Sequence, residues 1–342
     1  MFNPKYNISP KLLENIKRIS VIVARLNGRN FSQSILAKFE QKAKEISAHA
    51  STSIEGNPLP LTEVKRILKS RPEHLRDTEK EVLNYNEALG YLNGLFSSNN
   101  ASLNLDLILK IQKIITNGLV SDFHSGKLRQ GPVFVNDPIA KQPIYLPPDH
   151  QDVRKLMDGL LAFINGSAKK IDPLVLAGIF HKEFVLIHPF IDGNGRTARL
   201  ATKILLANLG IDTFNLFSFE NYYNNNISKY FQFVGERGNY YNLRDAIDYT
   251  LWLEYFTDGI IDELIRVSEE LKNSAIMPEN ILKPHHQIIL NYIKQNGHIA
   301  DTIYSSLTGR SKASRINDFN KLIRLGLIER IGKGRATIYK AK

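Results

Sequence analysis

The chain of 342 residues contains no cysteine. Disulfide bonds and thiolate metal sites are therefore excluded. No apolar run approaches the roughly 18 residues that a membrane-spanning helix needs, and residues 1–10 lack the apolar core of a signal peptide. We therefore expect a soluble, cytoplasmic protein with no membrane partner.

Acidic residues are scarce in the last part of the chain. Residues 281–342 hold 12 Lys and Arg but only 3 Asp and Glu, a net charge of +9, while the whole chain carries +11. The preceding residues, with 33 basic and 31 acidic side chains, are close to neutral. The positive charge of the last segment favours an anionic partner.

Helical spacing of apolar residues dominates the rest of the chain. It predicts helices at residues 12–26, 32–49, 61–68, 79–95, 105–119, 174–187, 200–209 and 248–264. One segment differs, because two short β-prone runs flank a polar turn at residues 136–138, which predicts a hairpin. Hydrophobic residues make up 43% of the chain, enough for ordinary packed cores. The predicted fold class is mainly α.

Residues 188–199 combine groups that suit a phosphate ligand. Gly193 and Gly195 let the backbone approach a ligand closely. A helix that begins near Asn194 would point its free N–H groups at the same loop. Arg196 and Arg199 are three residues apart, so they share a helix face and can grip phosphate oxygens.

The same segment carries a base and a hard oxygen ligand. His188 can accept a proton from a hydroxyl near neutral pH, and Asp192 suits Mg²⁺, which binds through few carboxylates plus substrate phosphates. Each residue alone has an ordinary explanation: a structural histidine, a glycine turn, or arginines on a solvated helix face. Their presence together in one short loop favours a phosphoryl site.

This segment resembles the Fic motif, His-x-Phe-x-Asp/Glu-Gly-Asn-Gly-Arg-x-x-Arg, at every specified position. Most Fic proteins transfer AMP from ATP to a Ser, Thr or Tyr hydroxyl of a protein. The resemblance implies that His188 is the general base and that Asp192 holds Mg²⁺. It assigns the ATP phosphates to Gly193, Asn194, Gly195 and Arg196, with Arg199 at the γ-phosphate. Phe190 would be a core anchor.

A second stretch resembles the inhibitory motif of many Fic proteins, Ser/Thr-x-x-x-Glu-Gly/Asn. Ser51 and Glu55 are four residues apart, followed by Gly56 as a helix stop. Without the resemblance, a charged helix end would explain this pattern. The resemblance implies that Glu55 pairs with Arg199, takes the place of the γ-phosphate and keeps the enzyme inactive, with Ser51 steadying the helix.

The predicted hairpin, at residues 131–147, corresponds to the Fic flap, which docks the target protein by β-strand addition. Its expected target contacts are Val133, Phe134, Ile144 and Tyr145. Residues 218–241 are rich in Tyr and Asn, and Tyr223 and Tyr230 are the residues predicted to lie against the nucleoside. Aromatic residues at helical spacing also suit a packed core.

The basic C-terminal segment resembles a winged helix-turn-helix domain: three helices followed by a hairpin at residues 327–339. A basic third helix, with Arg310, Lys312 and Arg315 at its start, and a wing tip at Lys333 and Arg335 suit DNA phosphates. A protein-docking or dimerising domain is the alternative.

The predicted architecture has three parts. Residues 1–100 form an N-terminal helical region with an inhibitory helix at about 45–57, residues 101–275 a Fic helical bundle with its flap, and residues 281–342 a small winged-helix domain. The predicted partners are a protein substrate, a second copy in a homodimer, and duplex DNA through residues 310–335. ATP and Mg²⁺ are the expected substrate and cofactor.

Three other functions remain open. The site could remove AMP from a modified protein, with Glu55 positioning water. It could transfer a different phosphate-containing group. The chain could instead be a DNA-binding regulator whose Fic core senses nucleotide. Neither the target nor the signal that relieves inhibition can be read from the sequence.

Overall fold

The computed structural model describes residues 2–28, 31, 33–97, 103–136, 142–207, 216–276, 282–332, 334 and 337–341. The chain divides into two compact units. Unit 1 comprises Met1–Gly28 and Lys42–Ile265, and unit 2 comprises Arg29–Gln41 and Arg266–Lys342. This division differs from the three predicted parts, because most of the N-terminal region belongs to the same unit as the central region.

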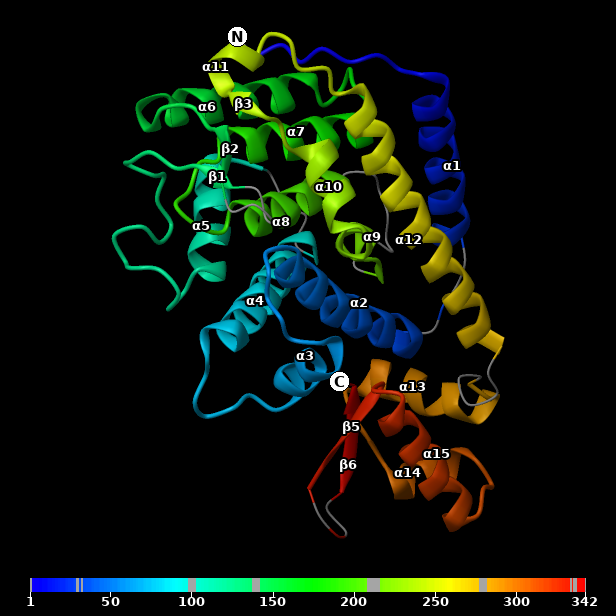
Figure 1. Cartoon of the computed structure of the whole chain (residues 1–342). Coiled ribbons are helices and arrows are strands. Elements are labelled where there is room, and N and C mark those ends of the chain that lie inside the picture. The colour runs from blue at the N-terminus through cyan, green and yellow to red at the C-terminus, as the bar shows by residue number, and fades with distance from the viewer. Residues whose placement is uncertain are drawn as a thin grey trace. The chain divides into compact units, whose positions relative to one another are not determined.

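Helices make up most of unit 1, as Figure 1 shows. They are α1 (Pro10–Asn27), α2 (Gln33–Ile54), α3 (Leu61–Lys69), α4 (Asp77–Ser97), α5 (Leu105–Ile115), α6 (His150–Ser167), α7 (Pro173–Ile187), α8 (Asn194–Ala207), α9 (Phe219–Asn225), α10 (Ile227–Val234), α11 (Tyr240–Leu243) and α12 (Thr250–Ile276). The ends of α2 and α12 extend into unit 2. The mainly α fold class is confirmed.

Several helices end at other residues than predicted, and α12 continues to Ile276 instead of ending at residue 264. Helix α2 continues to Ile54 instead of ending at His49, because no helix breaker occurs before Gly56, whose φ of 95° stops it. Helix α5 ends at Ile115 rather than Leu119, where the chain turns through Gly118 at φ 66°. The extension of α2 places Ser51 within a regular helix.

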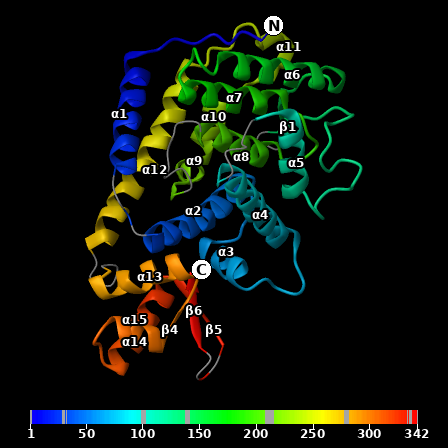
Figure 2. The ribbon, with the colours of Figure 1, turned by 180° about the vertical axis from the view of Figure 1, so that it is seen from behind.

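Helices α7 and α8 lie side by side at the centre of unit 1 in both views (Figures 1 and 2). Helix α7 begins with Asp172, whose side chain accepts from the Leu174 N–H at 2.8 Å, and with Pro173 at its first turn. Nearly every α7 side chain is buried, so the helix is apolar all round. Helix α8 packs against α4 and α5 on its other side.

Helix α12 covers the central pair with aromatic side chains. Trp252 is buried and its indole N–H donates to the Gly178 carbonyl of α7 at 2.7 Å. Gly178 allows this approach, since a Cβ there would lie 2.5 Å from Leu253. Along its outer face α12 meets α1, where Asn15 donates to Thr257 and Asp258 at 2.9 Å each.

A small sheet lies at one end of unit 1. Strands β1 (Val135–Asn136) and β2 (Pro143–Leu146) form the hairpin, and β3 (Gly238–Asn239) pairs with β2 in parallel. The register joins Val135 to Tyr145 and Tyr145 to Gly238. The hairpin is therefore shorter than predicted, since Val133 and Phe134 precede the paired residues. The turn at residues 137–141 lies outside the described residues.

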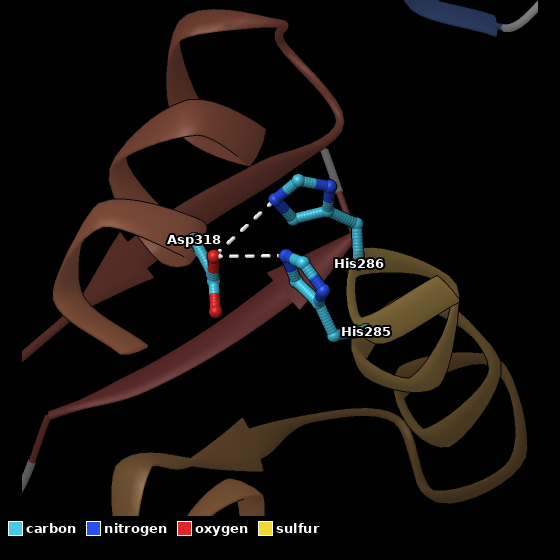
Figure 3. Close-up of side chains that lie close together, drawn as sticks. All are labelled: His285, His286 and Asp318. Carbon is cyan, nitrogen blue, oxygen red and sulfur yellow. Dashed lines mark ion pairs between the residues drawn. The ribbon is translucent and has the colours of Figure 1, made fainter. Parts of the chain in front are cut away.

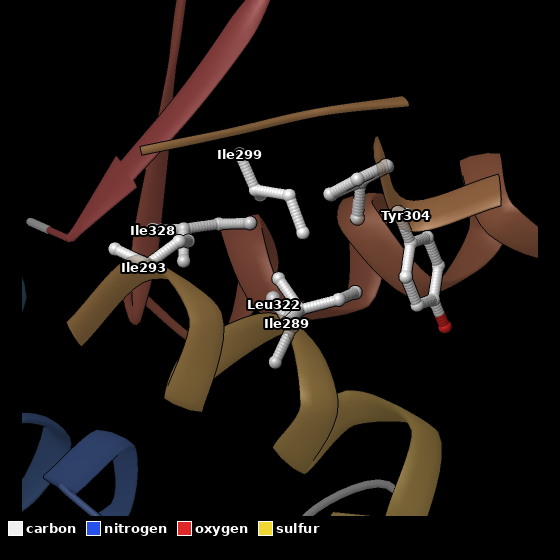
Figure 4. Close-up of a cluster of buried hydrophobic side chains, with 7 residues drawn as sticks. Ile289, Ile293, Ile299, Tyr304, Leu322 and Ile328 are labelled. Atoms are coloured by element: carbon white, nitrogen blue, oxygen red, sulfur yellow. The ribbon is translucent and has the colours of Figure 1, made fainter. Parts of the chain in front are cut away.

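Unit 2 contains α13 (Pro284–Asn296), β4 (Ile299–Ala300), α14 (Asp301–Leu307), α15 (Lys312–Arg324), β5 (Ile328–Ile331) and β6 (Ile338–Ala341). Three helices followed by a hairpin occur in the predicted order, but the second helix begins at Asp301 instead of Ile299. The short strand β4 was not predicted; it completes an antiparallel sheet in the order β4-β6-β5. Figure 4 shows the core, in which Ile289, Leu322 and Ile328 are fully buried. Among the described residues, no helix has the length and apolarity to cross a membrane.

Candidate active site

The candidate site is the loop that joins α7 to α8. Its backbone turns sharply at both ends, with His188 at φ 51° and Gly193 at φ 83°. A Cβ on Gly193 would lie 3.1 Å from Ile115 and 3.2 Å from Thr116, so glycine is needed there for space as well as for φ. His188 is the one non-glycine residue with positive φ among the described residues.

Asn194 holds the loop closed. Its side-chain oxygen accepts from the Phe190 N–H at 2.9 Å, and its side-chain nitrogen donates to the Phe190 carbonyl at 2.8 Å. The side chain is buried and both of its polar atoms are used. The side chain of Asn194 is thus used within the loop, and the predicted phosphate contact of Asn194 stays a prediction for its backbone N–H. Phe190 is fully buried, in accord with its predicted place in the core.

His188 has the geometry of a base. Its Nδ1 lies 3.1 Å from the Val185 carbonyl, which can only accept, so Nδ1 carries the ring proton. Burial is the main cause that lowers the pKa of His188, so the ring is neutral at pH 7. The lone pair is therefore on Nε2, ready to accept a proton from a substrate.

Asp192 and Arg196 form a pair at the start of α8. Arg196 Nη2 donates to both carboxylate oxygens, at 3.0 and 2.8 Å. Glu81 of α4 lies 3.5 Å from Arg196 Nη1. Although Arg196 is 2% exposed, its Nε and Nη1 have no hydrogen-bond partner among the described residues. A buried guanidinium with unused donors is suited to an anionic ligand.

Arg199 is fully buried and faces the end of α2. Its Nε donates to Ser51 Oγ at 2.7 Å, and its Nη2 donates to the Ser51 carbonyl at 2.8 Å and to Glu55 Oε1 at 2.7 Å. Burial opposes the charge of Arg199, but the Glu55 carboxylate raises its pKa above the ordinary value. The predicted contact between Glu55 and Arg199 is thus present.

Glu55 also lies directly over the first turn of α8. A Cβ on Gly195 would lie only 2.1 Å from Glu55 Oε1, so the carboxylate packs against the bare glycine. The first N–H groups of a helix have no partner within that helix and attract anions. The carboxylate of Glu55 therefore lies against the first turn of α8.

The two tyrosines predicted to bind the nucleoside are core residues. Tyr223 and Tyr230 are 0% and 1% exposed, and their rings stack on each other with centroids 4.9 Å apart. The Tyr223 hydroxyl lies 3.4 Å from the Phe256 carbonyl. The Tyr230 hydroxyl lies 3.0 Å from His181 and 3.4 Å from Arg199. The prediction is corrected, because aromatic packing between α9, α10 and α12 leaves neither ring a free face.

The hairpin residues predicted to contact the target differ in their exposure to solvent. Tyr145 is 4% exposed and its hydroxyl donates to the Leu186 carbonyl at 3.0 Å, so the predicted target contact is corrected to an anchoring contact. Phe134 is 57% exposed and free to meet a partner. Val133 and Ile144 are half-buried.

Two buried residues were missed from the sequence. Gln112 of α5 donates to the Asp192 carbonyl at 3.2 Å and accepts from the Gly126 N–H at 2.5 Å. Arg129 is 3% exposed and its Nε donates to the His188 carbonyl at 2.8 Å. Arg129 lies between the predicted helix at 105–119 and the predicted hairpin at 131–147, where the sequence shows no motif, and a single polar residue on an amphipathic helix gives no signal for Gln112.

Unit 2 holds a separate cluster of metal-ligating residue types: His285, His286 and Asp318 (Figure 3). The His286 Nδ1 accepts from the Lys283 N–H at 3.0 Å, which fixes the ring proton on Nε2, 3.4 Å from Asp318. A metal on Nε2 would force that proton onto Nδ1, against the Lys283 N–H. Arg310 already grips Asp318 at 2.6 and 3.0 Å. The cluster is a structural hub.

Comparison with known proteins agrees with this geometry. Residues 102–206, which include α5, the hairpin and the loop between α7 and α8, match the model of the Fic/DOC family. The chain is 32% identical over 164 residues to "Protein adenylyltransferase Fic" from Nematostella vectensis, covering 47% of this chain and 36% of that protein. It is 28% identical over 227 residues to the protein of the same name from Aedes aegypti, covering 61% and 43%.

The chain therefore spans less than half the length of these relatives. The structure is also similar to the crystal structure of a Fic family protein from Desulfovibrio desulfuricans G20, with a TM-score of 0.67 and 22% sequence identity. The alignment covers 100% of this chain and 98% of the chain in that crystal structure. That similarity establishes the fold alone. The match to the Fic/DOC family therefore covers residues 102–206, and this range includes the loop between α7 and α8.

Proposed function

We propose that this chain is a protein adenylyltransferase, which transfers AMP from ATP to a Ser, Thr or Tyr hydroxyl of a target protein and of itself. The observation that carries the proposal is the loop itself. A neutral His188 with its lone pair on Nε2 begins this loop, and Arg196 follows in the first turn of α8, buried and with no hydrogen-bond partner for its Nε among the described residues. The names of the relatives point to the same activity.

The residues at the start of α8 fit the phosphates of ATP. Arg196 offers Nε, which has no hydrogen-bond partner among the described residues, and Nη1, whose contact there is the ion pair with Glu81 at 3.5 Å. The N–H groups of the first turn, from Asn194 onward, add a positive dipole end. Arg199 would receive the γ-phosphate once Glu55 has moved, as the family resemblance implies.

Mg²⁺ fits the same place. The Asp192 side chain is 46% exposed, so its oxygens can reach a cation that also binds phosphates. When bound, the cation would neutralise the negative charge that develops on the phosphates during transfer. Asp192 would then exchange part of its contact with Arg196 for the metal, which frees Arg196 for the phosphates.

The reaction follows from these positions. His188 Nε2 takes the proton of the target hydroxyl, and the oxygen attacks the α-phosphorus of ATP. The bond between the α-phosphorus and its bridging oxygen breaks, and pyrophosphate leaves. The products are the phosphodiester of the target, pyrophosphate and the imidazolium of His188, which then returns its proton to solvent. Positioning and charge stabilisation provide most of the acceleration in such transfers.

The position of Glu55 supports an autoinhibited resting state. Its carboxylate balances the buried Arg199 and lies against Gly195, where it would repel the terminal phosphate. Glu55 is itself 31% exposed at the end of α2, so a small movement of this helix end would release it. The contact is thus suited to a reversible switch.

The flap offers one free edge for a target. At Tyr145 strand β2 is already paired on both sides, with Val135 of β1 and Gly238 of β3. We propose that an extended target segment adds to the outer edge of β1, beside the exposed Phe134. Strand addition there would bring a target hydroxyl towards the loop that carries His188.

Labelling with ATP that carries a tagged α-phosphate tests the proposal. The Glu55→Gly variant should label itself and a target at least roughly tenfold more than the unchanged protein, because the γ-phosphate site is open. Glu55→Gln is the matched control: it keeps the hydrogen bond to Arg199 and loses only the charge. In the Glu55→Gly background, His188→Ala should label nothing but still bind ATP. A folded Glu55→Gly protein that binds ATP and labels no protein would exclude the proposal.

Two other reactions at the same site have distinct signatures. Removal of AMP from a modified protein would appear as AMP release from purified AMP-modified target, with Glu55 required. Transfer of another phosphate-containing group would appear as a different adduct mass. The contact between Glu55 and Arg199 favours the forward reaction with inhibition, since that carboxylate lies in the γ-phosphate position implied by the resemblance.

For unit 2, we propose a winged helix whose third helix is α15. Two of the basic side chains chosen for DNA contact are used internally: Arg310 binds Asp318, and Arg315 binds Asp301 at 2.8 Å. The wing-tip residues Lys333 and Arg335 lie outside the described residues. Duplex DNA binding would then rest on Lys312 and Arg324, and we expect it to be weak and salt-sensitive. Homodimer formation and a cytoplasmic location stay predictions.

A further inference from the structure

The C-terminal end of α7 is tied to the flap by four successive carbonyl groups, those of residues 186–189. The Leu186 carbonyl accepts from the Tyr145 hydroxyl at 3.0 Å, and the His188 carbonyl from Arg129 Nε at 2.8 Å. The Ile187 carbonyl lies 3.5 Å from Arg129 Nη2, and the Pro189 carbonyl accepts from the Arg129 backbone N–H at 2.9 Å. The last carbonyls of a helix have no partner within it, so these contacts satisfy them from outside.

The same guanidinium also holds both ends of the flap. Arg129 Nη1 donates to the Gly131 carbonyl at 3.0 Å, and Nη2 donates to the Pro148 carbonyl. Gly131 precedes strand β1 and Pro148 follows strand β2. One planar side chain therefore joins the two ends of the hairpin to the residue that carries the base.

The backbone of His188 needs this support. A histidine at φ 51° lies in the left-handed region, which is uncommon for residues with a Cβ. Its carbonyl direction, and with it the place of Nε2, depends on the contacts that hold this residue. A positive side chain at the C-terminal end of α7 is also favoured by the helix dipole.

We propose that Arg129 and Tyr145 are positioning residues, which hold the flap in a fixed register with His188 so that a target hydroxyl docked on β1 meets Nε2. Neither residue touches ATP or the reacting atoms in this role. A lysine cannot replace Arg129, because one ammonium group cannot serve carbonyls in several directions within one plane. The inference rests on the proposed function for its catalytic consequence, but the anchoring itself can be measured separately.

The first test measures the flap directly by hydrogen exchange of backbone amides. Arg129→Lys and Tyr145→Phe should each speed exchange in strands β1 and β2 by roughly tenfold, while the amides of α7 and α8 keep their protection. Arg154→Gln is the matched control, because it removes a guanidinium from the exposed face of α6. Unchanged exchange in both variants would refute the anchor, whatever the protein catalyses.

The second test measures transfer of AMP in the Glu55→Gly background. Arg129→Lys should lower kcat/KM for a protein target by roughly tenfold or more, with the Kd for ATP unchanged. Tyr145→Phe should have a smaller effect in the same direction, and its ring keeps the fold intact if Arg129→Lys unfolds. A normal rate in both variants would overturn the positioning role. If Glu55→Gly alone transfers nothing, the proposed function fails and the exchange measurement still decides the anchor.

Discussion

Two buried arginine–carboxylate contacts in this chain are built in opposite ways. At the site, Arg199 is fully buried and donates a hydrogen bond of 2.7 Å to the Glu55 carboxylate. The Glu55 side chain is 31% exposed. In unit 2, Asp318 is 5% exposed and receives Arg310, Tyr304 and two histidines. On the proposed function, the Glu55 carboxylate is exchanged for the γ-phosphate of ATP, whereas the Asp318 carboxylate is held by several donors at once. The comparison sets a proposed switch against a structural hub.

Removal of the hub carboxylate should have the largest effect on stability. Asp318→Ala would leave Arg310, Tyr304 and His286 without their shared acceptor inside unit 2. We expect a loss of about 3 kcal/mol in the free energy of unfolding of that unit, measured by denaturant titration. Asp318→Asn is the control, since it keeps one acceptor oxygen. A loss below about 1 kcal/mol for Asp318→Ala would mean that the donors find other partners.

Removal of Glu55 should cause a smaller loss of stability than removal of Asp318, and ATP should reverse it. Glu55→Gly leaves Arg199 buried without its carboxylate, so we expect the ligand-free protein to lose about 1–2 kcal/mol of stability. ATP should restore this loss, because its γ-phosphate replaces the carboxylate and binding stabilises the folded state. The measurement is Tm with and without ATP. An equal ATP-induced rise in Tm in the unchanged protein would show that Glu55 does not compete with the nucleotide.

Gly195→Ala should disturb the switch without removing it. The new methyl group would lie 2.1 Å from Glu55 Oε1 and push the carboxylate away from Arg199. We expect the substitution to change ATP affinity several-fold when Glu55 is present and much less in the Glu55→Gly background. Calorimetric titration of the four proteins in this cycle measures the coupling. If the effects of the two substitutions are additive, the methyl group acts directly on phosphate binding and not through Glu55.

The smallest effect concerns pH and unit 2. Burial lowers the pKa of His286 to about 4, and burial also lowers the pKa of His285. An unfolded histidine titrates near 6.5, so between these values the unfolded chain binds more protons than the folded one. The stabilising contribution is therefore complete above about pH 6.5 and is lost as pH falls towards 4. The His286→Gln variant should lose less stability on acidification than the unchanged protein. Amide exchange in α13 and α15 at about pH 6.5 and about pH 4 measures this difference.

The sequence predicted the local structure around the candidate site. The helix boundaries around residues 188–199 were predicted, because the glycines and apolar periods there specify the local backbone. The contact between Glu55 and Arg199 was predicted only from the family resemblance, since no local pattern joins two residues that are 144 positions apart. The flap was predicted as a hairpin but not as a short one. The two tyrosines were misassigned, because a ring stacked in a core and a ring stacked on a nucleoside have the same helical spacing.

What the amino-acid sequence alone determined is local: which groups stand in the loop from His188 to Arg199, and which segments have the apolar period of a helix. Only the tertiary structure decided that the Asn194 side chain closes the loop, and that Tyr223 and Tyr145 are buried. It also decided that Arg129 joins the flap to His188. The physical reason is that buried polar groups must find partners, and their partners here lie between 4 and 59 residues away.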